Sequence, residues 1–154
     1  MFDAPLDTVY VWVGLGAVSL AVAGTVLSFP TTSPAAAGAV ADAVDTVAAS
    51  DHEARDGVAV PAGEMRLGPR ALALRTPDGT AHARFAYGPV VPVREGPLRQ
   101  VLLGTPPEDG FDDRTAFRRA LERARSRDPV WRETPERLHV RRVSWGEVNG
   151  TLVG

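Results

Sequence analysis

The sequence predicts an α+β protein with one N-terminal transmembrane helix, a short amphipathic helix, and then a mainly antiparallel β-sheet with one packed helix. An uncharged apolar run near the start, several short apolar runs separated by turn residues, and one stretch of apolar side chains at helical spacing support this prediction. We divide the chain into a short N-terminal leader (1–7), the transmembrane helix (8–29), a linker with the amphipathic helix (30–63), and a small α+β domain (64–154).

The apolar run TVYVWVGLGAVSLAVAGTVLSF, residues 8–29, contains no charge. At 1.5 Å per residue a helix of this length spans about 33 Å, enough to cross a hydrocarbon core of about 30 Å. A buried helix of a soluble protein and a cleavable secretory signal, with small residues at 35–37, remain as alternatives. We favour the membrane helix, because the run exceeds the usual length of a signal core and the leader contains no arginine.

Small side chains recur along one face of this predicted membrane helix. They are Gly14, Ala17, Ala21, Gly24 and Ser28. Their alternating spacing of three and four residues places them in one seam, where a second transmembrane helix could approach closely. Such a seam also arises by chance in a segment rich in small residues. The partners expected for this segment are the lipid bilayer and other transmembrane helices.

The segment after the membrane helix predicts a second helix and then a loop. Over residues 35–50, Val40, Val44 and Val47 share one face, and the two aspartates of the segment turn away from it. Residues 51–63 are polar and contain glycine and proline, which predicts a loop that leads into β structure.

Strands are predicted next along the chain. They cover residues 65–67, 71–74, 80–87, 90–93 and 98–103. Pro77, Asp78 and Gly79 predict a turn between two of these strands, with Gly79 free to adopt a positive φ.

Residues 114–127 predict the packed helix, capped by Asp112 or Asp113. Its buried stripe comprises Phe117, Ala120, Leu121 and Ala124. Residues 138–145 then alternate imperfectly as a strand, and Asn149-Gly150 is the dipeptide typical of a type I′ hairpin turn.

Composition argues against several functional classes. All 17 basic residues are arginine, and Asp3 and Asp7 account for two of the 19 carboxylates, so the rest of the chain is balanced at 17 of each charge and no nucleic-acid partner is expected. Cysteine is absent, and the three histidines lie on different predicted elements without a metal-ligand spacing. No phosphate-loop, dinucleotide or serine-hydrolase motif is present. We therefore expect no catalytic residues, no metal site and no cofactor.

Arginines crowd the predicted helix over residues 114–127. Arg118, Arg119 and Arg123 are the candidates for binding an acidic partner or lipid headgroups. The wider arginine group also contains Arg125, Arg127, Arg132, Arg141 and Arg142. The alternative interpretation is a solvated helix face on which Glu122 and Asp128 are interleaved with the arginines.

Several segments carry a resemblance to a known family. They are MFDAPLDTVYVWVG at the start, VDTVAAS, RLGPRALALR, DGTAHARFAYGPVVPV, and the closing RRVSW and TLVG. Together they resemble an uncharacterised family of small haloarchaeal single-pass membrane proteins, which look like pilin-like companions of archaeal type IV pilus or Tad-like secretion systems. The resemblance implies assembly rather than chemistry, with a hydrophobic N-terminal helix and an extracytoplasmic β-rich head.

The favoured functional hypothesis is a non-enzymatic, single-pass protein of the cell membrane, which serves as a pilin-like or accessory subunit of a surface or secretion assembly. Its extracytoplasmic orientation follows from the resemblance, because Arg55, the first basic residue, lies too far from the predicted helix for the positive-inside rule to apply. The alternatives are a membrane-tethered binding module that uses the arginine-rich helix face, and an enzyme of a type that no motif reveals.

Overall fold

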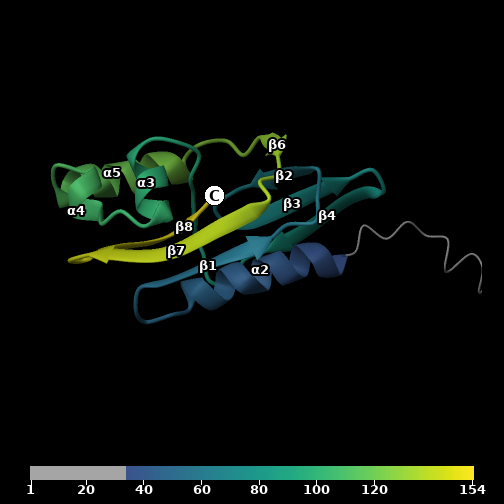
Figure 1. Cartoon of the computed structure of the whole chain (residues 1–154), viewed down its shortest axis with the longest axis horizontal. Coiled ribbons are helices and arrows are strands. Elements are labelled where there is room, and N and C mark those ends of the chain that lie inside the picture. The colour runs from purple at the N-terminus through teal and green to yellow at the C-terminus, as the bar shows by residue number, and fades with distance from the viewer. Residues whose placement is uncertain (1–33) are drawn as a thin grey trace, which may run out of the picture. The chain divides into compact units, whose positions relative to one another are not determined.

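Two four-stranded sheets organise residues 34–154, the part of the chain that the computed structural model describes (Figure 1). Sheet A has the strand order β1-β7-β8-β5, and sheet B has the order β4-β3-β2-β6. The predicted membrane helix over residues 8–29 and its seam of small residues lie outside the described residues. None of the helices from residue 34 onward has both the length and the apolar character that a bilayer-spanning helix requires.

The bounds of the elements confirm an α+β fold in which the strands pair mainly antiparallel. Sheet A contains β1 (Ala54–Ala59), β7 (Arg137–Trp145), β8 (Val148–Val153) and the short β5 (Val91–Pro92), which runs parallel to β8. Sheet B contains β4 (Gly79–Arg84), β3 (Ala71–Thr76), β2 (Glu64–Leu67) and β6 (Trp131–Glu133). The described helices are α2 (Pro34–Ala48), α3 (Pro97–Leu103), α4 (Pro107–Gly110) and α5 (Arg114–Arg125).

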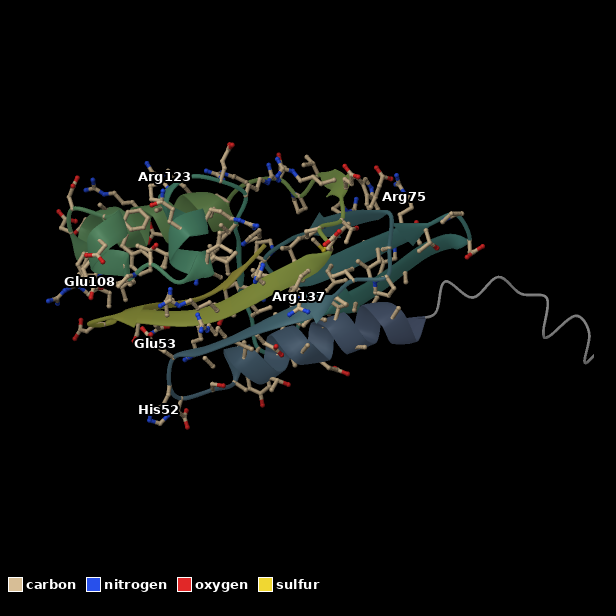
Figure 2. All side chains as sticks on the ribbon, in the orientation of Figure 1. His52, Glu53, Arg75, Glu108, Arg123 and Arg137 are labelled. Carbon is tan, nitrogen blue, oxygen red and sulfur yellow. The ribbon has the colours of Figure 1, made fainter. Side chains whose placement is uncertain are left out.

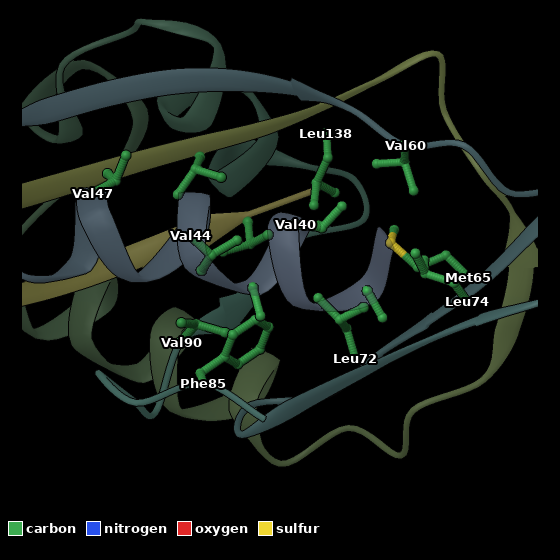
Figure 3. Close-up of a cluster of buried hydrophobic side chains, with 14 of the residues drawn as sticks. Val40, Val44, Val47, Val60, Met65, Leu72, Leu74, Phe85, Val90 and Leu138 are labelled. Carbon is green, nitrogen blue, oxygen red and sulfur yellow. The ribbon is translucent and has the colours of Figure 1, made fainter. Parts of the chain in front are cut away.

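Helix α2 packs against strands of both sheets through the apolar face that the sequence predicts (Figure 3). Val40, Val44 and Val47 are all buried, in a cluster that also contains Leu72 from sheet B and Leu138 from sheet A. Burying a side chain of this size contributes about 1.5–3 kcal/mol. The helix therefore belongs to the core, although it lies within the segment predicted as a linker and an amphipathic helix.

The opposite face of sheet A is covered by α3, α4 and α5 (Figure 1). The predicted stripe of α5 is confirmed, because Phe117, Ala120, Leu121 and Ala124 are all buried. The Phe117 ring lies 6.1 Å from the Trp145 ring of β7, measured between centroids. Sheet A is thus enclosed between α2 on one face and the three short helices on the other.

Two consecutive arginines of β7 bind the carboxyl-terminal ends of helices on these two faces. Arg142 donates a hydrogen bond from Nη1 to the carbonyl oxygen of Ala48, the last residue of α2, at 2.7 Å. Arg141 donates to the carbonyl oxygen of Val101 in α3, and to that of Thr105 at 2.9 Å. The carbonyl oxygen of Ala48 lies at a helix C-terminus, where carbonyl groups lack intrahelical partners and attract cations, so Arg142 satisfies the end of α2. The carbonyl oxygen of Val101 also accepts a hydrogen bond from the backbone N–H of Gly104 at 3.1 Å, so Arg141 adds a cation to an end that the backbone already caps.

Asp45 fixes the loop that follows β4. Its two carboxylate oxygens accept hydrogen bonds from the backbone N–H groups of Ala86, at 2.8 Å, and Tyr87, at 2.9 Å. The sequence pattern correctly predicts that Asp45 lies away from the valine face of the helix. The same pattern does not indicate that Asp45 binds the backbone of a loop some forty residues later in the chain.

The prediction of a strand over residues 98–103 is wrong, because this segment forms helix α3. Its buried side chains lie at the spacing of one helical face; they are Leu98, Val101 and Leu102. The helix begins at Pro97, where a fixed φ suits the first helical position, and it ends at Gly104, whose φ is +134°. Proline and glycine at these two places are the sequence signal for a short helix.

The prediction of a loop over residues 51–63 is wrong in part, because this segment contains strand β1. Ala54–Ala59 pairs antiparallel with Arg137–Arg142 of β7, although every one of its residues is partly or fully exposed. An exposed edge strand forms because it pairs with the neighbouring strand, more than because of its own apolar residues. The alternation of apolar and polar residues along its sequence is therefore weak.

The predicted type I′ turn at Asn149-Gly150 is also wrong. The β7–β8 hairpin turns at Gly146 and Glu147, and Asn149-Gly150 lies within β8. Gly146 has a φ of +64°, and no residue other than glycine has a positive φ in the described range, so the turn has glycine at its first central position as a type II′ turn requires. By contrast, the predicted turn at Pro77-Asp78 is confirmed, and Gly79 has a positive φ.

The packing of α2 gives a first testable expectation. Replacing Val44 by alanine should lower the free energy of unfolding by about 2 kcal/mol, because it removes fully buried methyl groups and leaves a cavity between the sheets. Thr46→Ala, on the exposed side of the same helix, is the matched control and should change the stability little. Urea unfolding of the full-length chain, followed by circular dichroism, measures both; equal effects would contradict the packing described above.

Candidate functional site: an arginine-lined groove beside helix α5

The arginines of helix α5 are exposed to solvent, because an N-cap determines where the helix starts and its apolar face is buried. Asp113 is the N-cap, and its side chain accepts a hydrogen bond from the backbone N–H of Ala116 at 2.7 Å. With the stripe around Phe117 buried against β5 and β8, the side chains Arg118, Arg119 and Arg123 are all exposed. Figure 2 shows Arg123 on the outer side of the α3–α5 layer, away from β7 and β8.

A groove of about 250 Å³ lies between α5 and the segment that connects β5 to α3. Its charged lining consists of Arg94, Arg123, Arg127 and Glu95. Its apolar lining includes Leu98, Phe111, Ala120 and Ala124. The groove thus combines three guanidinium groups and one carboxylate with an apolar floor.

Arg94 connects this groove to a neighbouring cavity. Its Nη2 donates a hydrogen bond to the carbonyl oxygen of Asp128 at 2.9 Å. Partial burial, and then the positive charges of Arg132 and Arg127, lower the pKa of Arg94, whereas Glu95 opposes this shift. The charged residues that line the cavity on its other side, about 130 Å³, are Arg94, Arg99, Arg132 and Glu133, three guanidinium groups and one carboxylate. Positive charge therefore extends from the groove across Arg94.

The arginines of the groove make no ion pair with any carboxylate of residues 34–154. Salt bridges in this part of the chain join only Arg75 to Glu64 and Arg141 to Glu53. Glu122 and Asp128, which could have neutralised the helix face, form no such contact. Unpaired arginines beside an apolar floor attract anionic groups, and the guanidinium fork can bind a carboxylate through two hydrogen bonds.

The structure separates the arginines that the sequence grouped together. Arg123 lines the groove, whereas Arg118 and Arg119 are exposed on α5 but do not line it. Arg141 and Arg142 instead bind helix carbonyl groups, as described above. The sequence interpretation missed Arg94, which lies outside the helix and joins the groove only through the tertiary fold.

Other residue types weighed from the sequence form no additional centre in the described residues. Asp113 is accounted for as a helix cap. Within residues 34–154, no group of three or more histidine, aspartate or glutamate side chains is placed so that it could hold a metal ion.

These features describe a small α+β domain with an arginine-lined groove on its helical side. The chain belongs to a family of unknown function, DUF7283, whose model matches residues 3–143. The match covers the predicted membrane helix and the domain as far as Val143 in β7. No curated protein and no solved structure matches the chain.

The start of α5 gives a second expectation. Asp113→Ala should lower the free energy of unfolding by about 0.5–2 kcal/mol, because the N–H of Ala116 loses its acceptor. Asp112→Ala is the control, since the neighbouring aspartate is exposed and makes no capping bond. Thermal unfolding of the full-length variants distinguishes the two positions, and a larger effect at Asp112 would refute the assignment of the cap.

Proposed function

We propose that this protein is a non-enzymatic, membrane-tethered binding module that holds an acidic segment of a partner protein in the groove beside α5. The observation that carries the proposal is a set of three arginines, Arg94, Arg123 and Arg127, that make no ion pair within the described residues and surround an apolar floor. An acidic segment with apolar residues would satisfy both parts of the groove at once.

The chemistry of the groove favours a peptide over a bare ion. The arginines supply charge-assisted hydrogen bonds, and the apolar lining near Phe111 and Leu98 supplies contact area that a small anion could not use. Exposed charges also steer an oppositely charged partner during its approach, so association should weaken as the salt concentration rises.

The tether in this proposal is the apolar run over residues 8–29. Only residues 30–33 separate its end from the start of α2 at Pro34. A domain attached through so short a connection would stay close to the membrane surface. We propose that the protein lies in the cell membrane with its C-terminal domain outside the cytoplasm, an orientation that the resemblance to haloarchaeal membrane proteins supports.

Binding of a fluorescent, glutamate-rich peptide to the full-length chain tests the groove. The double variant Arg123→Ala, Arg127→Ala should weaken binding roughly tenfold, because two exposed charge pairs are lost. It should also reduce the dependence of the affinity on salt concentration.

Two single variants serve as controls for this measurement. Arg119→Ala lies on the same helix outside the groove, and Arg70→Ala removes an exposed arginine of another region. Both should change the affinity by much less than the double variant. Equal losses for all variants would indicate a diffuse charge effect and would overturn the assignment to the groove.

A second function, the pilin-like or accessory assembly subunit, is favoured by the position of α2. This helix follows the predicted membrane segment almost directly and packs along antiparallel strands, as expected of a β-rich head carried by a hydrophobic helix. The proposed assembly contacts are the seam Gly14, Ala17, Ala21, Gly24 and Ser28, with transmembrane helices of pilus or secretion subunits as partners.

Leucine at Gly14, Ala21 and Gly24 should abolish co-purification of membrane partners under this second function, because the larger side chains prevent close helix approach. Leucine at Val18 and Val22, outside the seam, is the control. Protease treatment of intact cells that carry a C-terminally tagged chain reports the orientation in the same samples, and a tag protected from protease would overturn the extracytoplasmic location.

A further inference from the structure

A second pocket, separate from the groove, lies at the edge of sheet A where β5 ends. β5 pairs only with Leu152 and Val153 of β8, so the residues of β8 before them have no strand on that side among the described residues. A pocket of about 260 Å³ opens there. Its polar side chains are Tyr87, Arg125, Arg142, Asn149 and Thr151, which come from the loop after β4, from α5, and from both strands of the β7–β8 hairpin.

The wall of this pocket carries two positive charges and no carboxylate. The guanidinium group of Arg125 makes no hydrogen bond or ion pair with the rest of the described chain, and its Nε is buried without a partner. Burial lowers the pKa of Arg125, an effect that Glu122 opposes. A partly buried arginine without an acceptor is costly for the free protein and is satisfied when an anion binds.

Thr151 provides a second polar group in the lining of the same pocket. It is the one buried polar residue of the described chain, with 5% of its surface exposed. Thr151 lies opposite Arg142 in the register of β7 and β8, so both side chains lie on the same face of the sheet. Arg142 uses Nη1 to bind Ala48 at 2.7 Å and retains further N–H donors.

Backbone segments border the pocket on two sides. Gly150 has no side chain, and a Cβ atom at this position would lie 3.5 Å from Nη2 of Arg125. A longer side chain would therefore compete with the guanidinium group for this space. On the other side of the pocket, the two hydrogen bonds from Ala86 and Tyr87 to Asp45 hold the loop that carries the Tyr87 wall.

We propose that this pocket binds a phosphate-class oxyanion, supplied by free phosphate or by the phosphodiester of a lipid headgroup. Phosphate has several acceptor oxygens and negative charge, and the pocket offers the forked donors of Arg125 and Arg142 with the hydroxyl of Thr151 and the amide of Asn149. The site is independent of the groove, since the two share no lining residue.

Calorimetric titration of the full-length chain in a maltoside detergent tests the proposal. The ligands are inorganic phosphate and glycerophosphoglycerol, a water-soluble phosphodiester headgroup. Saturable binding of either is expected, and the one that binds tighter identifies the source. Arg125→Gln should weaken binding roughly tenfold or more, as the loss of a charged donor predicts.

Thr151→Val keeps the test valid if the arginine variant fails to fold. It is nearly isosteric, so it should weaken phosphate binding about two- to tenfold, as expected for one neutral hydrogen bond, without lowering the melting temperature of the free protein. Arg123→Ala, in the groove, should bind phosphate like the unchanged chain while it loses affinity for the acidic peptide. The absence of saturable binding, or undiminished binding by both pocket variants, would overturn the proposal.

Discussion

Burial of the valine face of α2 is the interaction on which the rest of this domain depends. Sheets A and B are separate hydrogen-bonded units, and apolar side chains from both reach the same helix. Removing that helix would expose both inner surfaces to water and forfeit the hydrophobic free energy that holds the two sheets together. The polar contacts follow from this placement, because α2 also brings Asp45 to the loop after β4 and the carbonyl oxygen of Ala48 to Arg142.

The chain is nearly balanced in total charge, yet its arginines are distributed unevenly. Those of the groove beside α5 are mostly exposed, so their attraction for an anion acts at long range and is screened by salt. Arg125 at the other pocket is partly buried, where water and salt screen less and the orientation of each donor matters more. The two proposed sites therefore differ in physical character. The groove would select a ligand by charge and contact area, whereas the pocket would select by the geometry of its donors.

Local sequence patterns correctly predicted the elements that depend on residues close together in the sequence. The stripe of α5 and the valine face of α2 follow directly from helical spacing, and Pro77-Asp78 marks a turn with no tertiary help. Strand β1 could not be predicted in this way, because its pairing with β7 rather than its own composition makes it a strand. The two sites follow the same division. Arg123 could be named from the helix pattern, whereas Arg94 joins the groove, and Arg125 comes to line one pocket with Thr151, only through long-range folding.

The adjacent arginines of β7 have a consequence for strand alignment. Because neighbouring side chains of a strand point to opposite faces, Arg141 and Arg142 reach helix ends on opposite sides of sheet A. A shift of β7 by one residue would bring one arginine into the position of the other and a valine, Val140 or Val143, into the remaining position, so one helix end would lose its cation. The pair thus disfavours misalignment of the central hairpin, because a one-residue slip in either direction would place a valine against a helix end that Arg141 or Arg142 now binds.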